Sequence, residues 1–174
     1  MKLRMIIIAT AAVVVATINF SSHATTLLAD DAAQVSALHK RMIDFVVNLG
    51  QIELSMARSN GPFKEQLCLM RISDQAGGIN LYLYGANLVV PLASKMADPT
   101  DEMWLLVNAL SALSALSDAL ENAKKEINEI FGRCQSRLVY DQAKSLLDLT
   151  EETRKITVPM LKRVQAALPT GFGR

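Results

Sequence analysis

The chain has 174 residues, of which 51% are hydrophobic, and its 18 basic and 17 acidic residues leave a net charge of +1. This length suits one domain with its own core, and the near balance of charge gives no field that would attract nucleic acid or an anionic lipid surface. We therefore expect a single domain without a nucleic-acid partner.

The first residues, MKLRMIIIATAAVVVATINFSSHATT, follow the order of a secretory signal peptide. Lys2 and Arg4 precede 14 almost uninterrupted apolar residues, Met5 to Ile18, and Ser22 and Ala24 supply the small residues that a signal peptidase needs. A membrane-spanning helix needs about 20 apolar residues, so this run is short for an anchor. We predict cleavage after Ala24, and an uncleaved N-terminal anchor is the alternative.

Cleavage there would export the rest of the chain to the periplasm or out of the cell. No cysteine near the cleavage site could carry a lipid and no arginine pair marks a twin-arginine route, so we expect no membrane contact afterwards. Loss of Lys2 and Arg4 lowers the 18 basic residues to 16 against 17 acidic ones, a net charge of −1. The predicted parts are a signal peptide over 1–24, a helical bundle domain over 25–168 and a flexible tail over 169–174.

A helix over residues 30–58 is the strongest periodic signal. Its apolar residues lie three and four positions apart over three heptads, as expected for one buried helix face. They are Val35, Leu38, Met42, Phe45, Leu49, Ile52 and Met56. Asp30 and Asp31 suit the N-terminus, because carboxylates can cap free N–H groups there, and Ser59-Asn60-Gly61-Pro62 cannot continue the helix.

The segment that follows Pro62 is harder to assign. Residues 79–90, INLYLYGANLVV, alternate like a strand and contain a turn signal at Gly85, so a hairpin is one possibility. Polar or weakly helix-forming residues nevertheless recur at three and four positions, which favours a helix. These are Ser73, Gly77, Asn80, Tyr84, Asn87, Pro91 and Ser94. We predict a helix that is interrupted near Gly77-Gly78 and kinked at Pro91.

Asp98-Pro99-Thr100-Asp101 predicts the start of a third helix, with a cap, a proline at the first helical position and an acidic residue in the first turn. An apolar stripe with a seven-residue repeat runs to a stop at Gly132, so we expect a helix over 99–131. The stripe consists of Leu106, Leu110, Leu113, Leu116, Leu120, Ile127 and Ile130.

A fourth helix is predicted after Cys134. Its apolar side consists of Val139, Ala143, Leu146, Leu149, Thr153, Ile156, Met160, Val164 and Ala167. Pro159 follows three β-branched residues and should kink or split this helix, because proline lacks the N–H group that the helix needs. The tail PTGFGR has no periodicity.

Four long helices joined by short turns predict an all-α fold: an antiparallel four-helix bundle with an up-down-up-down path and a kinked second helix, preceded by a signal peptide. This path puts the start of the second helix and the start of the fourth at the same end. Cys68 and Cys134 lie at these two places, so we predict a disulfide between them, which export would favour. Two unpaired buried thiols are the alternative.

Few residues suggest catalysis. His39 is the one histidine that remains after signal cleavage, and the sequence has no motif for haem attachment, zinc, di-iron, a nucleophile elbow or a phosphate loop. We expect the acidic pairs Asp30-Asp31 and Glu151-Glu152 on solvated helix faces. Ion pairs four residues apart are expected for Glu121 with Lys125, Glu129 with Arg133 and Glu151 with Lys155. We therefore predict no enzyme, no metal site and no cofactor.

One polar stripe stands out in the second helix. Asn80, Tyr84 and Asn87 share a face of a helix that is otherwise apolar, so their polar groups must meet water, a partner or each other. We interpret them as a possible binding face, in contrast to His39, which has no visible second group. The sequence thus predicts an exported soluble helical bundle that acts by binding a protein partner, as an interaction or adaptor module. A bundle that binds a small molecule or cofactor is the alternative.

Overall fold

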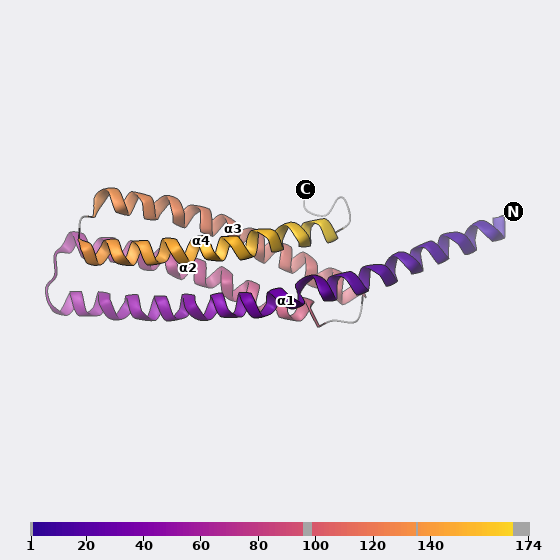
Figure 1. Cartoon of the computed structure of the whole chain (residues 1–174), viewed down its shortest axis with the longest axis horizontal. Coiled ribbons are helices and arrows are strands. Elements are labelled where there is room, and N and C mark those ends of the chain that lie inside the picture. The colour runs from indigo at the N-terminus through magenta and orange to yellow at the C-terminus, as the bar shows by residue number, and fades with distance from the viewer. Residues whose placement is uncertain (1, 96–98, 135, 169–174) are drawn as a thin grey trace.

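The structure, a computed structural model, describes residues 2–95, 99–134 and 136–168, with only the backbone given for residues 2–27, 29 and 99–102. Over these ranges the protein has four helices and no strand (Figure 1). They are α1 (Lys2–Arg58), α2 (Phe63–Ala93), α3 (Pro99–Arg133) and α4 (Arg137–Ala167). The predicted all-α class and the number of helices within the domain are confirmed, and the predicted tail lies outside the described residues.

The four helices pack against one another around a single apolar core. Each helix contacts the next one in the sequence, and α4 also contacts α1. The N-terminal part of α1 projects beyond the other helices (Figure 1). The predicted stripes supply most of the largest buried side chains, each worth about 1.5–3 kcal/mol on burial. Those in the predicted stripes are Leu38, Met42, Leu49, Leu106, Leu113, Leu116 and Leu120, and α2 adds Leu69, Ile72, Ile79 and Leu83 from a stripe that was not predicted.

The predicted start of the first helix at residue 30 is wrong, because α1 runs without interruption from Lys2. No glycine precedes Gly50 and no proline precedes Pro62, so nothing in the sequence breaks the helix at the two aspartates. Asp31 is not a cap either. Its carboxylate is buried and forms an ion pair with Arg163 near the end of α4.

The predicted end of this helix at residue 58 is confirmed, and its geometry explains the stop. Asn60 has a φ of 51°, and the N–H groups of Asn60 and Gly61 donate to the carbonyls of Ala57 and Met56 at 3.3 and 3.0 Å. This pair of bonds satisfies carbonyls that the helix leaves free. A Cβ at Gly61 would lie 2.5 Å from Cγ of Met56, so a larger residue there would force the Met56 side chain to move.

The second segment is one helix and not a hairpin, as predicted, but the expected interruption at Gly77-Gly78 is wrong. α2 passes through both glycines because residues on either side continue a buried stripe at three and four positions. This stripe consists of Leu69, Ile72, Ala76, Ile79, Leu83, Ala86, Val90 and Ala93. Packing thus outweighs the cost of about 1 kcal/mol for each glycine. Pro91 lies inside the last turn, where the kink stays a prediction.

The last two helices each differ from the prediction at one point. α3 continues through Gly132 to Arg133, two residues past the expected stop. α4 contains Pro159 without being split by it. Met103–Arg133 is, by length and composition, the one helix long and apolar enough to cross a membrane among the residues searched, yet its apolar stripe belongs to the core of the bundle.

α4 buries more polar residues than the apolar pattern indicates. Thr150 and Thr157 join the predicted Thr153 in the core. Each hydroxyl donates to the carbonyl four residues earlier, at 2.7, 2.9 and 2.7 Å respectively, so none needs a partner outside the helix. The threonines are therefore tolerated in the core.

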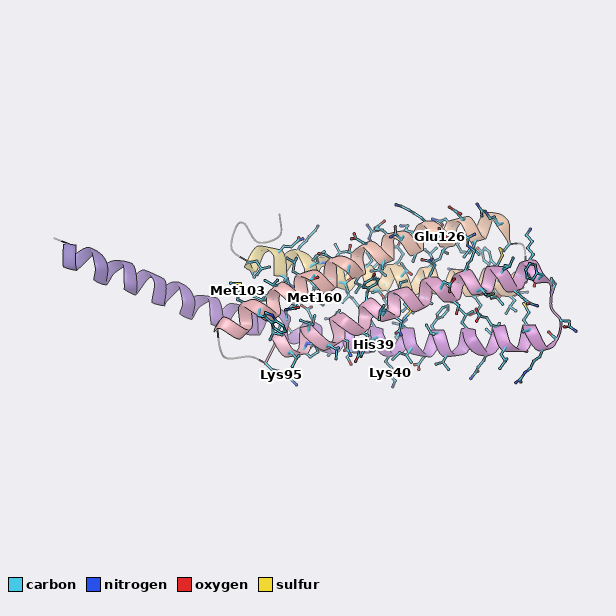
Figure 2. The ribbon with its side chains drawn as sticks, turned by 180° about the vertical axis from the view of Figure 1, so that it is seen from behind. His39, Lys40, Lys95, Met103, Glu126 and Met160 are labelled. Atoms are coloured by element: carbon cyan, nitrogen blue, oxygen red, sulfur yellow. A yellow bond between two sulfur atoms is a disulfide. The ribbon has the colours of Figure 1, made fainter. Side chains whose placement is uncertain are left out.

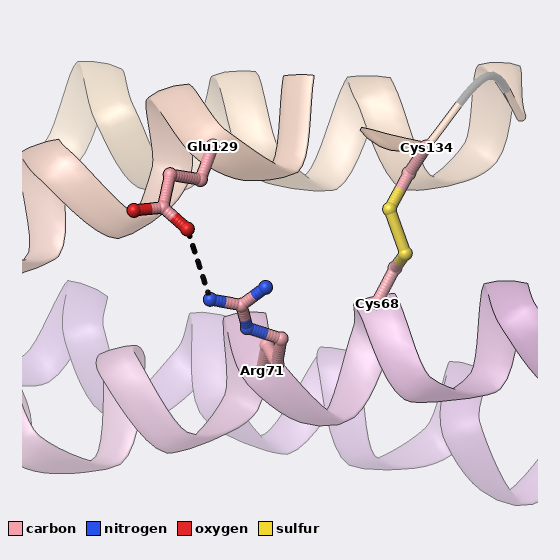
Figure 3. Close-up of a disulfide and its surroundings, with 4 residues drawn as sticks. All are labelled: Cys68, Arg71, Glu129 and Cys134. Carbon is pink, nitrogen blue, oxygen red and sulfur yellow. Dashed lines mark ion pairs between the residues drawn. A yellow bond between two sulfur atoms is a disulfide. The ribbon is translucent and has the colours of Figure 1, made fainter. Parts of the chain in front are cut away.

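The predicted disulfide is present. Cys68 in the first turns of α2 and Cys134 just after α3 are bonded, with their Cα atoms 6.6 Å apart (Figure 3). Figure 3 also shows Arg71, one turn after Cys68, at 3.5 Å from a carboxylate oxygen of Glu129. A covalent bond and an ion pair thus join α2 and α3 at this end.

Candidate functional site

The predicted binding residues lie along the line where α2 packs against α1. The side-chain amide nitrogen of Asn87 is 3.3 Å from Nδ1 of His39 on α1. The ring of Tyr84 lies against the same histidine, with ring centroids 5.6 Å apart and an angle of 48° between the planes. Figure 2 labels His39 on α1 beside α2. Two of the three predicted residues are therefore brought together, with a histidine between them.

The interpretation that His39 has no second group to act with is wrong. A contact 48 residues apart in sequence has no local signature, so the pattern of either helix alone could not reveal it. Because the imidazole is held by Asn87 and Tyr84, a change at any of the three disturbs the others. His39 belongs to the same surface as the predicted face.

Asn80 does not reach this group. Its side-chain oxygen is buried without a hydrogen-bond partner. Contacts between α1 and α2 repeat every seven residues: His39 contacts Asn87, and Glu53 contacts Ser73. This register puts Val46 opposite Asn80. The middle position opposite Asn80 is therefore filled by an apolar residue, Val46, which leaves the amide oxygen unsatisfied.

Glu53 is the electrostatically strained member of this polar line. Burial raises the pKa of its carboxyl, a hydrogen bond with the Ser73 hydroxyl lowers it in part, and the nearby charge of Asp74 raises it again. One of the two carboxylate oxygens is buried without a partner. The charged form of Glu53 is thus disfavoured in the folded protein.

Replacement of this residue, Glu53→Gln, is expected to stabilise the protein at pH 7 by up to about 1 kcal/mol. A raised native pKa means that the folded state binds more protons than the unfolded state above about pH 4.3, so wild-type stability falls as pH rises through that native pKa. Glutamine stays neutral and avoids this loss of stability. Urea melts of the wild type and the variant at pH 4 and pH 7 test the prediction, and the stabilisation should be larger at pH 7. A variant that is equally destabilised at both pH values would contradict it.

A second apolar stripe runs along the outer surface of α2. Its positions also repeat at three and four residues, and they point away from the bundle, with Phe63 73% and Leu81 66% exposed. The stripe consists of Phe63, Leu67, Met70, Asp74, Gly77, Leu81, Tyr84 and Leu88, all exposed. α2 thus has one heptad stripe in the core and another on the surface, the latter with a single charged residue.

α1 contributes a parallel, shorter stripe. Ile43, Val47 and Leu54 are 39%, 55% and 52% exposed, and Gly50 lies between the last two. A groove of about 380 Å³ separates the two stripes near the turn that joins α1 and α2. Its walls include Gly50, Leu54 and Ala57 of α1 and Gln66 and Met70 of α2. We call the two stripes and this groove together the outer face.

The other three sides of the bundle are different, because ion pairs bridge their helices. Arg41 pairs with Glu152 between α1 and α4, Arg71 with Glu126 between α2 and α3, and Lys124 with Glu151 between α3 and α4 at 2.6 Å. Among the described residues, no ion pair joins α1 to α2. Within the described ranges, the outer face thus lacks the ion pairs that bridge the helices on the other three sides.

These ion pairs correct the predicted role of the acidic pairs. Glu151 and Glu152 do not simply face solvent but bridge to other helices, and Lys124 lowers the pKa of the Glu151 carboxyl through its hydrogen bond. Glu121 pairs with Arg154 on α4 at 2.7 Å. Of the three predicted pairs within a helix, the one between Glu129 and Arg133 is present, at 3.3 Å.

The described part of the chain has no cluster of three or more His, Cys, Asp or Glu side chains that could hold a metal ion. Comparisons of the chain with protein-family models, with curated proteins and with solved structures found no match. No relative therefore assigns a role to any residue, and the outer face with its His39 group is the candidate site.

Proposed function

We propose that this protein acts by binding a protein partner through the outer face of α1 and α2. The observation that carries the proposal is the second heptad stripe of α2, which exposes large apolar side chains on a helix whose opposite side is already buried. A helix with a second apolar stripe is expected to have that stripe covered as well. An exposed contiguous apolar patch of this kind is typical of a protein interaction site.

The polar residues at the edge of this face, His39, Tyr84 and Asn87, support specific recognition of a partner over non-specific hydrophobic association. Asn87 and Tyr84 offer uncharged hydrogen-bonding groups beside the apolar stripe, and tyrosine is enriched where partners bind tightly. Such groups orient a partner without the large desolvation cost of a charge. Tyr84 and Asn87, two of the three predicted binding residues, thus lie in or beside the apolar stripe.

Export to the periplasm or the cell exterior is part of the proposal, and so are the cleaved signal peptide over 1–24 and the up-down-up-down path. The sequence of the first 24 residues supports the signal, and the Cys68–Cys134 disulfide suits an oxidising compartment. Leu28, four residues after the proposed cleavage site, is already part of the core, so cleavage would leave the domain intact. The up-down-up-down path is supported by the short turns, because successive turns lie at opposite ends of the helices.

Mass spectrometry of the protein from its native host tests the export proposal. The expected N-terminus is Thr25, since Ser22 and Ala24 suit the peptidase. The control is the Ala24→Arg variant, which should keep the longer chain because a large residue blocks cleavage. A wild-type protein that retains Met1 and sediments with membranes would contradict export as a free domain.

Tyr84→Ala tests the binding proposal, with Tyr140→Ala on α4 as the matched control. The two tyrosines are 49% and 50% exposed, and each has its ring tilted by 48° against a neighbour. Cross-linking in the native host, followed by identification of the linked protein by mass spectrometry, should give a partner whose yield falls about 10-fold or more in Tyr84→Ala only. Equal yields from both variants would contradict the proposal.

A further inference from the structure

We propose that the partner on the outer face is a second copy of this chain, which packs its own outer face against the first in a two-fold symmetric dimer. This inference rests on the proposed function and names its partner. Such an interface is isologous, so the same surface must carry both the projecting and the receiving features. The outer face has both.

The receiving features lie on one half of the face. The groove of about 380 Å³ is bounded by Gly50 and Leu54 on α1 and by Met70 on α2. A Cβ built at Gly50 or at Gly77 would meet no atom within 4 Å, so the surface above both glycines is open to side chains from outside. This half can accept apolar side chains.

The side chains that could fill this groove lie on the other half. Beyond Gly77, the stripe of α2 carries Leu81, Tyr84 and Leu88, which are 66%, 49% and 48% exposed. A two-fold axis perpendicular to the helices, near Gly77, exchanges the two halves. It therefore places the projecting side chains of each copy over the groove of the other, as knobs over holes.

The size of the face agrees with a dimer. A large apolar side chain has a surface of roughly 150–200 Å², so the exposed fractions of the nine large apolar residues of the face correspond to about 700–1,000 Å² per copy. A standard stable interface buries ~800 Å² per partner. These residues are Ile43, Val47, Leu54, Phe63, Leu67, Met70, Leu81, Tyr84 and Leu88.

The charge of the face agrees with it as well. Its two stripes contain one charged residue, Asp74, from Ile43 to Leu54 on α1 and from Phe63 to Leu88 on α2, and the groove adds one ionisable residue, Glu53. Depletion of charge is the feature that separates the core of a homodimer interface from ordinary surface. The other three sides carry ion pairs between their helices, so they are less suited to an apolar interface.

Sedimentation equilibrium of the exported chain, with its disulfide intact, tests the proposal. Between about 1 and 100 µM the wild type should convert from monomer to dimer, with a Kd of about 10 µM or lower. Leu81→Asp should weaken the dimer by roughly 100-fold or more, because the two-fold axis would bury the new carboxylate close to Asp74 of the other copy, with no cation to pair with either. Trp104→Asp on α3 is the matched control, since Trp104 is also 66% exposed, and should leave the dimer unchanged.

Three results would overturn the second copy as partner: a wild-type monomer at all concentrations, a dimer that persists in Leu81→Asp, or a monomer that instead binds vesicles of neutral phosphatidylcholine. Circular dichroism of each variant checks that it folds. If the wild type is a monomer but Tyr84→Ala still loses a cross-linked partner of another mass, the proposed function stands and only the dimer fails. If neither association is seen, both fail.

Discussion

Removal of the disulfide, by Cys68→Ala together with Cys134→Ala, is expected to lower the free energy of unfolding by roughly 4 kcal/mol. The bond joins residues 66 positions apart. Cross-linking a loop of this length lowers the conformational entropy of the unfolded chain, which stabilises the folded state. The loss is large against the ~5–15 kcal/mol that stabilises a typical domain. Urea melts of the double variant and of the oxidised wild type measure it.

Chemical reduction of the wild type serves as the control for this double variant. Both treatments open the same loop, so the two melts should nearly coincide. Only a small difference is expected, because the variant has methyl groups in place of the two buried thiols. A double variant as stable as the oxidised wild type would mean that the unfolded chain gains little freedom from the missing bond.

Truncation of the core, by Leu49→Ala, is expected to cost about 2–5 kcal/mol. Leu49 is fully buried in the stripe of α1, so the shorter side chain loses apolar contact and leaves a cavity. Lys125→Ala, on the exposed surface of α3, is expected to stay within about 0.5 kcal/mol.

Denaturant melts of both variants, at protein concentrations low enough to exclude association, decide this prediction. Equal losses for Leu49→Ala and Lys125→Ala would mean that the heptad stripe of α1 does not form the core. A loss confined to Leu49→Ala supports the packing of α1 through this stripe.

The sequence predicts the core well because burial imposes a period that can be counted. The stripes of α1, α3 and α4 are each interrupted by polar residues on the opposite side, so the apolar positions are distinct. The disulfide follows from the same pattern, since the helix order alone brings Cys68 and Cys134 to one end. These features depend on many residues acting together and are not sensitive to any one of them.

Capping residues and glycines predict the ends of the helices less reliably. Asp30-Asp31 resemble a helix start and Gly77-Gly78 a helix break, but α1 and α2 continue through both, because neighbouring residues remain helix formers or continue a buried stripe. A cap or a glycine contributes about 1 kcal/mol, which packing of a long helix can outweigh. Such signals therefore locate helix ends only where the apolar stripe also stops, as at Asn60.

The candidate site could be predicted only in part. The polar positions Asn80, Tyr84 and Asn87 are visible as a repeat, but their contact with His39 depends on the register between two helices, which no single helix encodes. The outer stripe of α2 is hidden in the sequence for another reason. Where two apolar stripes share one helix, apolar residues occur on every side and neither stripe contrasts with its surroundings.

The two ends of the bundle are closed by different kinds of bond, and this difference bears on how the native state opens. The disulfide closes the end where α2 begins and α4 follows α3, and it is indifferent to salt. The opposite end of α4 is held to α1 by Asp31 and Arg163, whose side chains are 10% and 42% exposed, so dissolved ions reach the pair from the arginine side. Opening motions, and the amide exchange that reports them, should therefore begin at the salt-sensitive end and fade toward the covalent one.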